Sequence, residues 1–257
     1  MSFISLVSVE FMKIKRSKIL FILLAATIIL WLPSILNVHL NFGMQAEGIS
    51  PENNFFIQGF MAMSWFMFPA SMVICTVLLN QTERLNKGII KMLALPIHSM
   101  KLCLAKFMVL LALAASQLLM MAGMYYGSAA ICSAAQDYNF ILPPVFVAKE
   151  MGLLFLSAIP MTAFFYMLSV SIQTPIFSVG IGLASIVPSV LIINTKLWFA
   201  YPMSYPFFVI TSEYGKLAAN LDTAQVTLIP WIPVAIAVTL ITLFISCIRF
   251  GQAERRE

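Results

Sequence analysis

The chain has 257 residues, of which 61% are hydrophobic and only 10% are charged, and its net charge is +5. Soluble domains carry about 25% charged residues, so this composition excludes a soluble globular protein, which would lack the polar surface to cover its apolar residues. We therefore predict an all-α membrane protein with a single transmembrane domain over residues 1–257. The basic residues lie beside apolar segments, where the positive-inside bias explains them without a nucleic-acid partner.

The first segment, residues 1–18, is predicted to form an amphipathic helix in the membrane interface. Its apolar residues recur at helical spacing, and it ends in a basic cluster of Lys13, Lys15, Arg16 and Lys18. Such a helix lies with its apolar face in lipid and its lysines near the phosphates. The alternative is a disordered basic N-terminus. A cleavable signal peptide is not expected, because the following apolar run is too long and lacks a small-residue cleavage site.

Six apolar segments that can cross a bilayer follow, since about 20 residues span its hydrocarbon core. They are residues 19–36, 55–79, 107–131, 151–172, 176–193 and 226–248. As drawn, they contain no Asp, Glu, Lys, Arg or His, which argues against ion-coupled transport and against an intramembrane metalloprotease. Five of them contain proline, which could act as a hinge or merely kink the helix.

The orientation follows from the basic residues. Six spans place both termini on the same side of the membrane. If that side is the cytoplasm, twelve of the fifteen Lys and Arg residues lie inside, as the positive-inside bias requires. We therefore expect a multi-pass protein with both termini in the cytoplasm.

The outward-facing connections in this orientation are rich in acidic residues. Candidates for attracting a cationic substrate are Glu47, Glu52, Asp137 and Glu213. An acidic outer surface could equally be the passive complement of the positive-inside bias.

Residues 194–225 are too short and too proline-rich to span the membrane cleanly. Trp198, Tyr201 and Tyr205 lie within them, and such amphipathic rings favour the membrane interface. We predict short extracellular or re-entrant helices packed over the outer end of the bundle. The alternative is a plain loop with apolar aromatics.

The largest predicted cytoplasmic connection is the charged segment of residues 80–106. Its candidate coupling residues are Glu83, Arg84, Lys87, Gly88, Lys91 and Pro96. Glu83 and Lys87 form an i,i+4 pair in the favourable order, which supports a short helix. Such a helix could insert into a groove on a cytoplasmic ATPase. The alternative is a solvated basic loop.

The sequence contains no G-x-x-x-x-G-K-[ST] nucleotide-binding loop, so the chain is not expected to hydrolyse ATP or to be an enzyme. Its four cysteines form no C-x-x-C pair, so a metal site or a bound cofactor is not expected either. Movement would then be passive or driven by another chain.

The amphipathic N-terminus, the six spans, and Glu83, Gly88, Pro96 and Lys106 in the second connection together resemble the membrane subunit of an ABC-2 type ABC transporter. The resemblance implies that residues 80–106 couple to ABC ATPase subunits, expected as a homodimer that binds ATP and Mg. It also implies re-entrant helices before the last span and a second permease subunit, related or identical.

Within that family, the short, methionine-rich chain is similar to permeases of lantibiotic immunity and resistance systems. The resemblance implies a bacterial plasma membrane and the expulsion of an antimicrobial peptide from the membrane lipid. Two alternatives stay open. The substrate could be another amphipathic or lipid-linked molecule, such as bacitracin, or the chain could be a non-transporting sensor or scaffold.

Small residues within the spans mark candidate helix-packing positions. Gly123 and Gly127 form a G-x-x-x-G pattern in the third span, and Gly182 lies in the fifth. Such positions let helices approach closely within one chain or between two chains.

Overall fold

The computed structural model describes residues 2–84, 99–218 and 228–253. All the regular elements in these ranges are helical, as predicted. Chain order gives α1 (Phe3–Arg16), α2 (Ile19–Leu36), η1 (Val38–Glu47), α3 (Pro51–Ala62), η2 (Met63–Met67), α4 (Phe68–Arg84), α6 (Ser99–Gln136), α7 (Pro144–Ser171), α8 (Pro175–Ala184), α9 (Ser189–Ile192), η3 (Trp198–Ala200), η4 (Pro202–Ser204), α10 (Tyr205–Leu217) and α11 (Leu228–Ala253). Six stretches in the described ranges are long and apolar enough to cross a membrane, which confirms the predicted number of spans.

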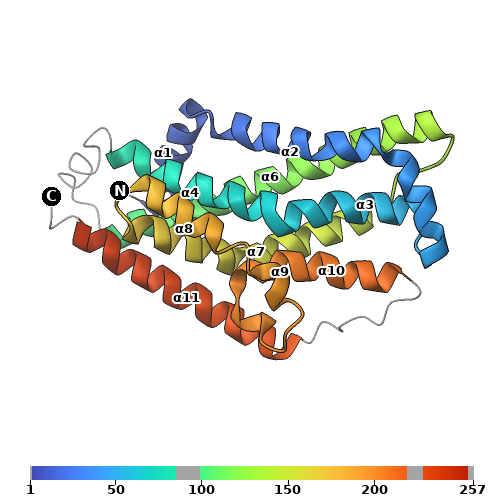
Figure 1. The fold of residues 1–257 in the computed structure, drawn as a ribbon. Coiled ribbons are helices and arrows are strands. Elements are labelled where there is room, and N and C mark those ends of the chain that lie inside the picture. Colours follow the sequence, from blue (N-terminus) through green and yellow to red (C-terminus); the bar gives the residue numbers. More distant parts are fainter. Residues whose placement is uncertain (1, 85–98, 219–227, 254–257) are drawn as a thin grey trace.

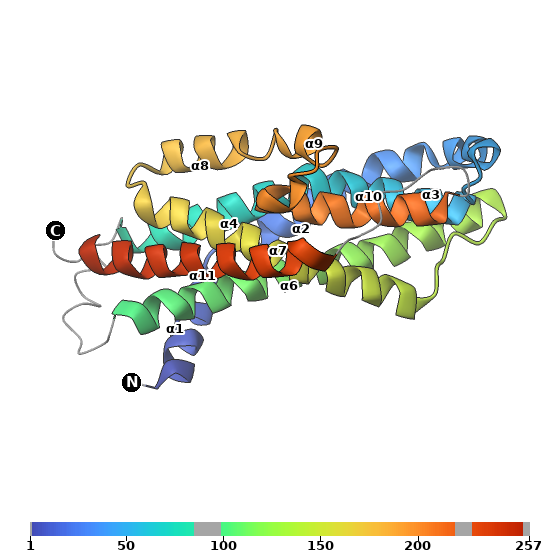
Figure 2. The same ribbon diagram turned by 90° about the horizontal axis from the view of Figure 1, so that it is seen from below.

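The long helices lie side by side in an elongated bundle (Figure 1). Both chain termini lie at one end, which we call the terminal end, where α1, the start of α6 and the end of α11 meet (Figures 1 and 2). The opposite end, the far end, holds η1, the start of α3 and the connection between α6 and α7. α11 packs mainly against α7 and α6, and α2 packs mainly against α6.

The third and fourth spans are longer than hydropathy indicated. α6 begins at Ser99, before the predicted residue 107, and α7 begins at Pro144, before the predicted residue 151. The extra turns carry Lys106 on α6 and Glu150 on α7, so these two helices continue past the charge-free segments predicted from hydropathy. Hydropathy falls at the first charged residue, whereas backbone hydrogen bonding continues through it.

The second span runs through α3, η2 and α4 without a loop. η2 is a π-helical turn that ends two residues before Pro69. Because Pro69 has no backbone N–H and its ring crowds the preceding turn, the regular ladder is interrupted there. The fifth predicted span also departs from a regular helix. α8 ends at Ala184, and α9 begins only after Pro188.

Part of the predicted segment 194–225 is described, up to residue 218, and it forms the short helices η3, η4 and α10. α10 packs against α7 and α3. Trp198 stacks on Phe208 with their ring centroids 3.6 Å apart, which anchors η3 on α10. The residues are therefore organised as packed helices rather than as a plain loop.

A cluster of buried aromatic side chains joins the helices towards the far end. The Trp31 ring lies 5.4 Å from that of Phe55 and 5.8 Å from that of Tyr125, measured between centroids. The Tyr125 hydroxyl donates to the Phe140 carbonyl at 3.0 Å. A Cβ at Gly59 would lie 2.5 Å from the Trp31 ring, so only glycine leaves room for this indole. The cluster fixes α2, α3 and α6 to one another.

Candidate functional site

The candidate site lies at the terminal end, where α1 packs against α6. α1 begins at an N-cap serine, Ser2, whose hydroxyl accepts from the Ser5 amide, and it ends before Ser17. Leu6, Glu10 and Ile14 follow one another at i,i+4 spacing, and all three are buried. The predicted amphipathic helix therefore exists and rests one face on protein, while its place in a membrane interface stays a prediction.

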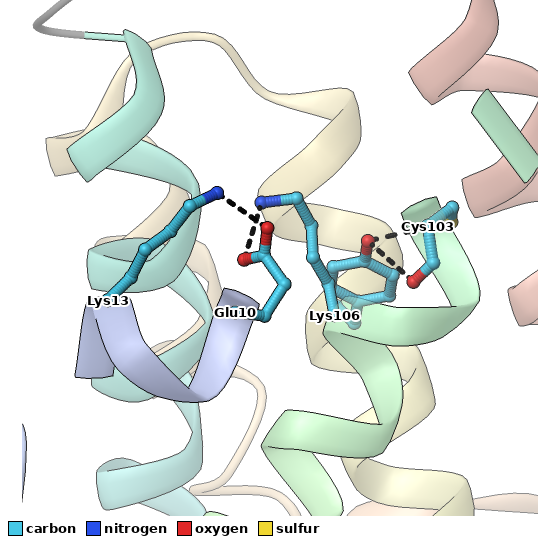
Figure 3. Close-up of polar contacts among 5 residues, drawn as sticks. Glu10, Lys13, Cys103 and Lys106 are labelled. Carbon is cyan, nitrogen blue, oxygen red and sulfur yellow. Dashed lines mark hydrogen bonds and ion pairs between the residues drawn. The ribbon is translucent and has the colours of Figure 1, made fainter. Parts of the chain in front are cut away.

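Glu10 joins two lysines from different helices (Figure 3). One of its carboxylate oxygens lies 2.5 Å from Lys13 Nζ, and the other lies 3.4 Å from Lys106 Nζ. The Glu10 and Lys106 side chains are 1% and 0% exposed, and that of Lys13 is 30% exposed. A buried carboxylate is tolerable only when opposite charge and hydrogen bonds replace its water, and here the lysines supply both.

Further contacts surround Lys106. Its ammonium lies 6.0 Å from the ring centroid of Phe250 on α11, within the range of a cation–π interaction. One turn earlier on α6, the Cys103 carbonyl accepts a hydrogen bond of 3.2 Å from the Tyr166 hydroxyl on α7. Four helices, α1, α6, α7 and α11, are thus joined at this end by polar contacts.

α4 leads into the charged segment of residues 80–106, and near its end it is joined to α7 by hydrogen bonds. Asn80 Nδ2 donates to Ser169 Oγ on α7 at 2.5 Å. Ser169 Oγ in turn donates to the Thr76 carbonyl at 3.0 Å. Because these groups are buried, breaking the chain of bonds would leave polar atoms without partners.

The predicted coupling residues fall partly outside the described residues. Glu83 and Arg84 close α4. Lys87, Gly88, Lys91 and Pro96 lie outside the described ranges. The described flanks place the two ends of this segment on helices that are tied to α7 and to α1. The charged segment of residues 80–106 is therefore joined to the bundle through α4 and α6 together.

The predicted packing glycines occupy different environments. A Cβ at Gly182 would lie 2.7 Å from Val73 Cγ1, so α8 approaches α4 closely at this point. Gly123 and Gly127 are exposed, and a Cβ at either would meet no atom of the described chain within 4 Å.

The predicted recruitment acids lie away from the terminal end, and two of them have internal partners. The Tyr138 hydroxyl donates to the Glu52 carboxylate. Lys216 Nζ donates to Glu213 Oε2 at 2.9 Å, and the Glu213 side chain is buried. Asp137 is exposed beside the end of α6, and the side chain of Glu47 lies outside the described part.

The hydrogen bond to the Glu52 carboxylate raises the pKa of Tyr138 from its usual 10 to about 12, with burial adding to the shift. Tyr138 therefore remains a neutral donor at physiological pH.

The sequence analysis does not predict the burial of two acidic side chains. Glu10 was hidden among basic residues, although its i,i+4 relation to Leu6 and Ile14 places it on the apolar face of α1, where an acid needs a partner. Glu150 is fully buried and lies 3.4 Å from Lys149 Nζ, without a hydrogen bond to its oxygens. No signal in the sequence distinguishes it from a loop acid.

No group of three or more His, Cys, Asp or Glu side chains that could hold a metal occurs within residues 2–84, 99–218 and 228–253. Comparison with known families gives one match, a model described as ABC-2 family transporter protein, which covers residues 6–189. No curated protein and no solved structure matches the chain.

Proposed function

Because this chain belongs to the ABC-2 transporter family, it is a multi-pass membrane permease subunit, and we propose that it expels a lantibiotic or a similar antimicrobial peptide from the membrane. The family implies an ABC ATPase as partner. The observation that carries the mechanism is the buried joint at the terminal end, in which Glu10 ties α1 to Lys106 of α6 beside the charged segment.

The proposed cycle begins when ATP closes a dimer of ATPase subunits against residues 80–106. α4 and α6 receive this movement at their ends, and the Asn80–Ser169 and Glu10–Lys106 contacts pass it to α7 and α1. ATP drives the change because it binds one arrangement better than the other. A second permease chain, related or identical, completes the transporter.

We propose that the terminal end faces the cytoplasm of a bacterial cell. The distribution of Lys and Arg supports this orientation. The far end, with Asp137 exposed, would then face outward, where a cationic peptide arrives from outside. The internal partners of Glu52 and Glu213 leave less free acidic charge for recruitment than the sequence predicts.

The proposal is tested by a killing assay. Cells that lack this chain, and cells that regain it with its ATPase, are exposed to a nisin-like peptide and to bacitracin. Restored tolerance to the peptide alone supports the proposal. Tolerance to bacitracin alone would instead favour a lipid-linked substrate, and tolerance that does not need an active ATPase would favour a sensor or scaffold.

A further inference from the structure

An apolar groove of about 410 Å³ lies between α7 and α11. The helices contribute Leu153, Leu156, Pro160, Trp231, Ala235 and Thr239 to its walls, and Tyr205 at the start of α10 also lines it. Ile232, Ile236 and Leu240 follow at i,i+4 spacing along the same wall and are exposed. The groove therefore opens where a spanning helix presents apolar side chains outward.

The depth of the groove in the membrane follows from α11 itself. Between Ile229 and Ile248 this helix has no charged residue, and Arg249 follows. Ile229 is not helical, and the residues from Pro230 to Ile248 measure about 28 Å, close to the thickness of the hydrocarbon core. Trp231 then lies at the boundary away from the termini, where tryptophan side chains settle. Trp231 and Leu240 are about 14 Å apart along the helix, so the groove covers the depth of one leaflet.

Aromatic rings and a hydrogen-bond donor without a partner among the described residues belong to the Trp231 end of the groove. The Trp231 ring lies 5.4 Å from that of Trp198 and 5.6 Å from that of Tyr205, between centroids. The indole N–H of Trp231 is buried and has no hydrogen-bond partner among the described residues. A buried donor without a partner is costly, so an acceptor supplied by a ligand would be stabilising there.

The opposite wall, on α7, also offers a polar group, the backbone carbonyl of Leu156. Pro160 has no N–H, so it cannot donate to the carbonyl of Leu156 one turn earlier on α7. Apart from these groups, apolar side chains dominate the walls. The groove thus combines a long apolar channel with a hydrogen-bond donor at the membrane boundary, which is the pattern of a molecule with hydrocarbon chains and ester or phosphate oxygens.

We propose that this groove binds one acyl chain of a membrane glycerophospholipid from the leaflet away from the termini, with Trp231 Nε1 donating to an ester or phosphate oxygen of the same molecule. A bilayer surrounds this face and supplies such chains at high local concentration. The occupant is thus a lipid of the membrane rather than the transported molecule, and the site does not depend on the peptide substrate proposed above.

The test is photo-labelling of the full-length chain in liposomes that contain phosphatidylglycerol with a diazirine on its acyl chain. After irradiation and digestion, mass spectrometry maps the adducts. We expect adducts concentrated on residues 153–160 and 231–240.

Ala235→Phe fills the groove and should lower this labelling by about fivefold or more, and Ala235→Leu should lower it less. Trp231→Phe keeps the ring and removes the donor, so labelling in competition with unlabelled lipid should fall roughly three- to tenfold.

The matched control is Ala237→Phe, because Ala237 is an exposed alanine on the same helix outside the groove. It should leave the labelling unchanged. Uniform labelling of the exposed apolar surface, or equal labelling of the Ala235→Phe and Ala237→Phe chains, would overturn the proposal. So would an Ile236→Cys chain that forms a disulfide-linked dimer in the membrane, because a second protein chain would then occupy the groove.

Discussion

At the scale of single residues, the contact that matters most is the one between Glu10 and Lys106. The two charges come from helices that are far apart in the sequence, and neither side chain is exposed to solvent. A buried pair of this kind adds little stability compared with an apolar pair of similar shape, but losing one partner removes the charge that compensates the other. Its role is therefore to hold α1 in one place on α6.

Glu10→Gln is expected to destabilise the chain by about 3–5 kcal/mol, because it removes the buried negative charge that compensates Lys106. Adding Lys106→Met should recover part of the loss, since both charges are then gone. Thermal unfolding in detergent measures both effects. Lys101→Met removes an exposed lysine from the same helix and should change nothing, and a double variant less stable than Glu10→Gln would contradict the coupling.

The Tyr138–Glu52 contact predicts a pH dependence at the far end. The pKa of Tyr138 is raised to about 12 in the folded chain, above the value near 10 of an exposed tyrosine. The stabilisation is therefore fully present below pH 10 and is lost as the pH rises through 12. The melting temperature of the wild type should exceed that of Tyr138→Phe by a constant amount up to about pH 10, and the difference should then shrink. A difference that grows with pH would contradict this assignment.

Single residues also show what sequence reasoning could reach. The apolar periodicity predicted α1, yet it hid Glu10, because a carboxylate on a buried face needs a partner that the sequence does not identify. Lys106 was assigned to the cytoplasmic segment because hydropathy drops there, whereas the helix continues through it with its ammonium neutralised by Glu10. The ion pair between Glu10 on α1 and Lys106 on α6 depends on the tertiary structure, so local sequence patterns do not predict it.

At the scale of elements, the helices are fixed by a few close approaches. Gly59 and Gly182 admit the Trp31 ring and the Val73 side chain, respectively, whereas a Cβ added at Gly123 or Gly127 would meet no atom of the described residues within 4 Å. Sequence patterns selected the exposed pair because G-x-x-x-G is recognisable and missed Gly59, whose need for glycine comes from a tryptophan on another helix. Hydropathy likewise does not reveal the break of the fifth span near Pro188, because it is averaged over a window of residues that includes the break.

Gly59→Ala should lower stability by about 1–3 kcal/mol, because the added methyl would overlap the ring of Trp31 in a packed core. Gly127→Ala is the matched control, since it adds the same methyl at a position where it would meet no atom of the described residues within 4 Å. Melting temperatures in detergent compare the two. Equal stability of both variants would show that the indole can move aside and that the close approach is not essential.

At the scale of the whole molecule, the two ends of the bundle differ in construction. The terminal end is joined by buried polar contacts around Lys106 and Asn80, and the far end is joined mainly by an aromatic cluster around Trp31 and Tyr125. The charged segment that is proposed to meet the ATPase begins and ends at the polar end. Under this proposal, a force applied there would reach α1, α4, α6, α7 and α11, whereas the aromatic cluster keeps α2, α3 and α6 together.

The central claim is that a separate ATPase drives this chain through residues 80–106. Its most direct test is co-purification of the full chain with its ATPase, with measurement of ATP hydrolysis in liposomes. The wild type should bind the ATPase and change its rate of hydrolysis, and Glu83→Ala combined with Gly88→Pro should lose both effects while the melting temperature stays unchanged. Undiminished complex formation and unchanged ATPase stimulation by that variant would contradict the account.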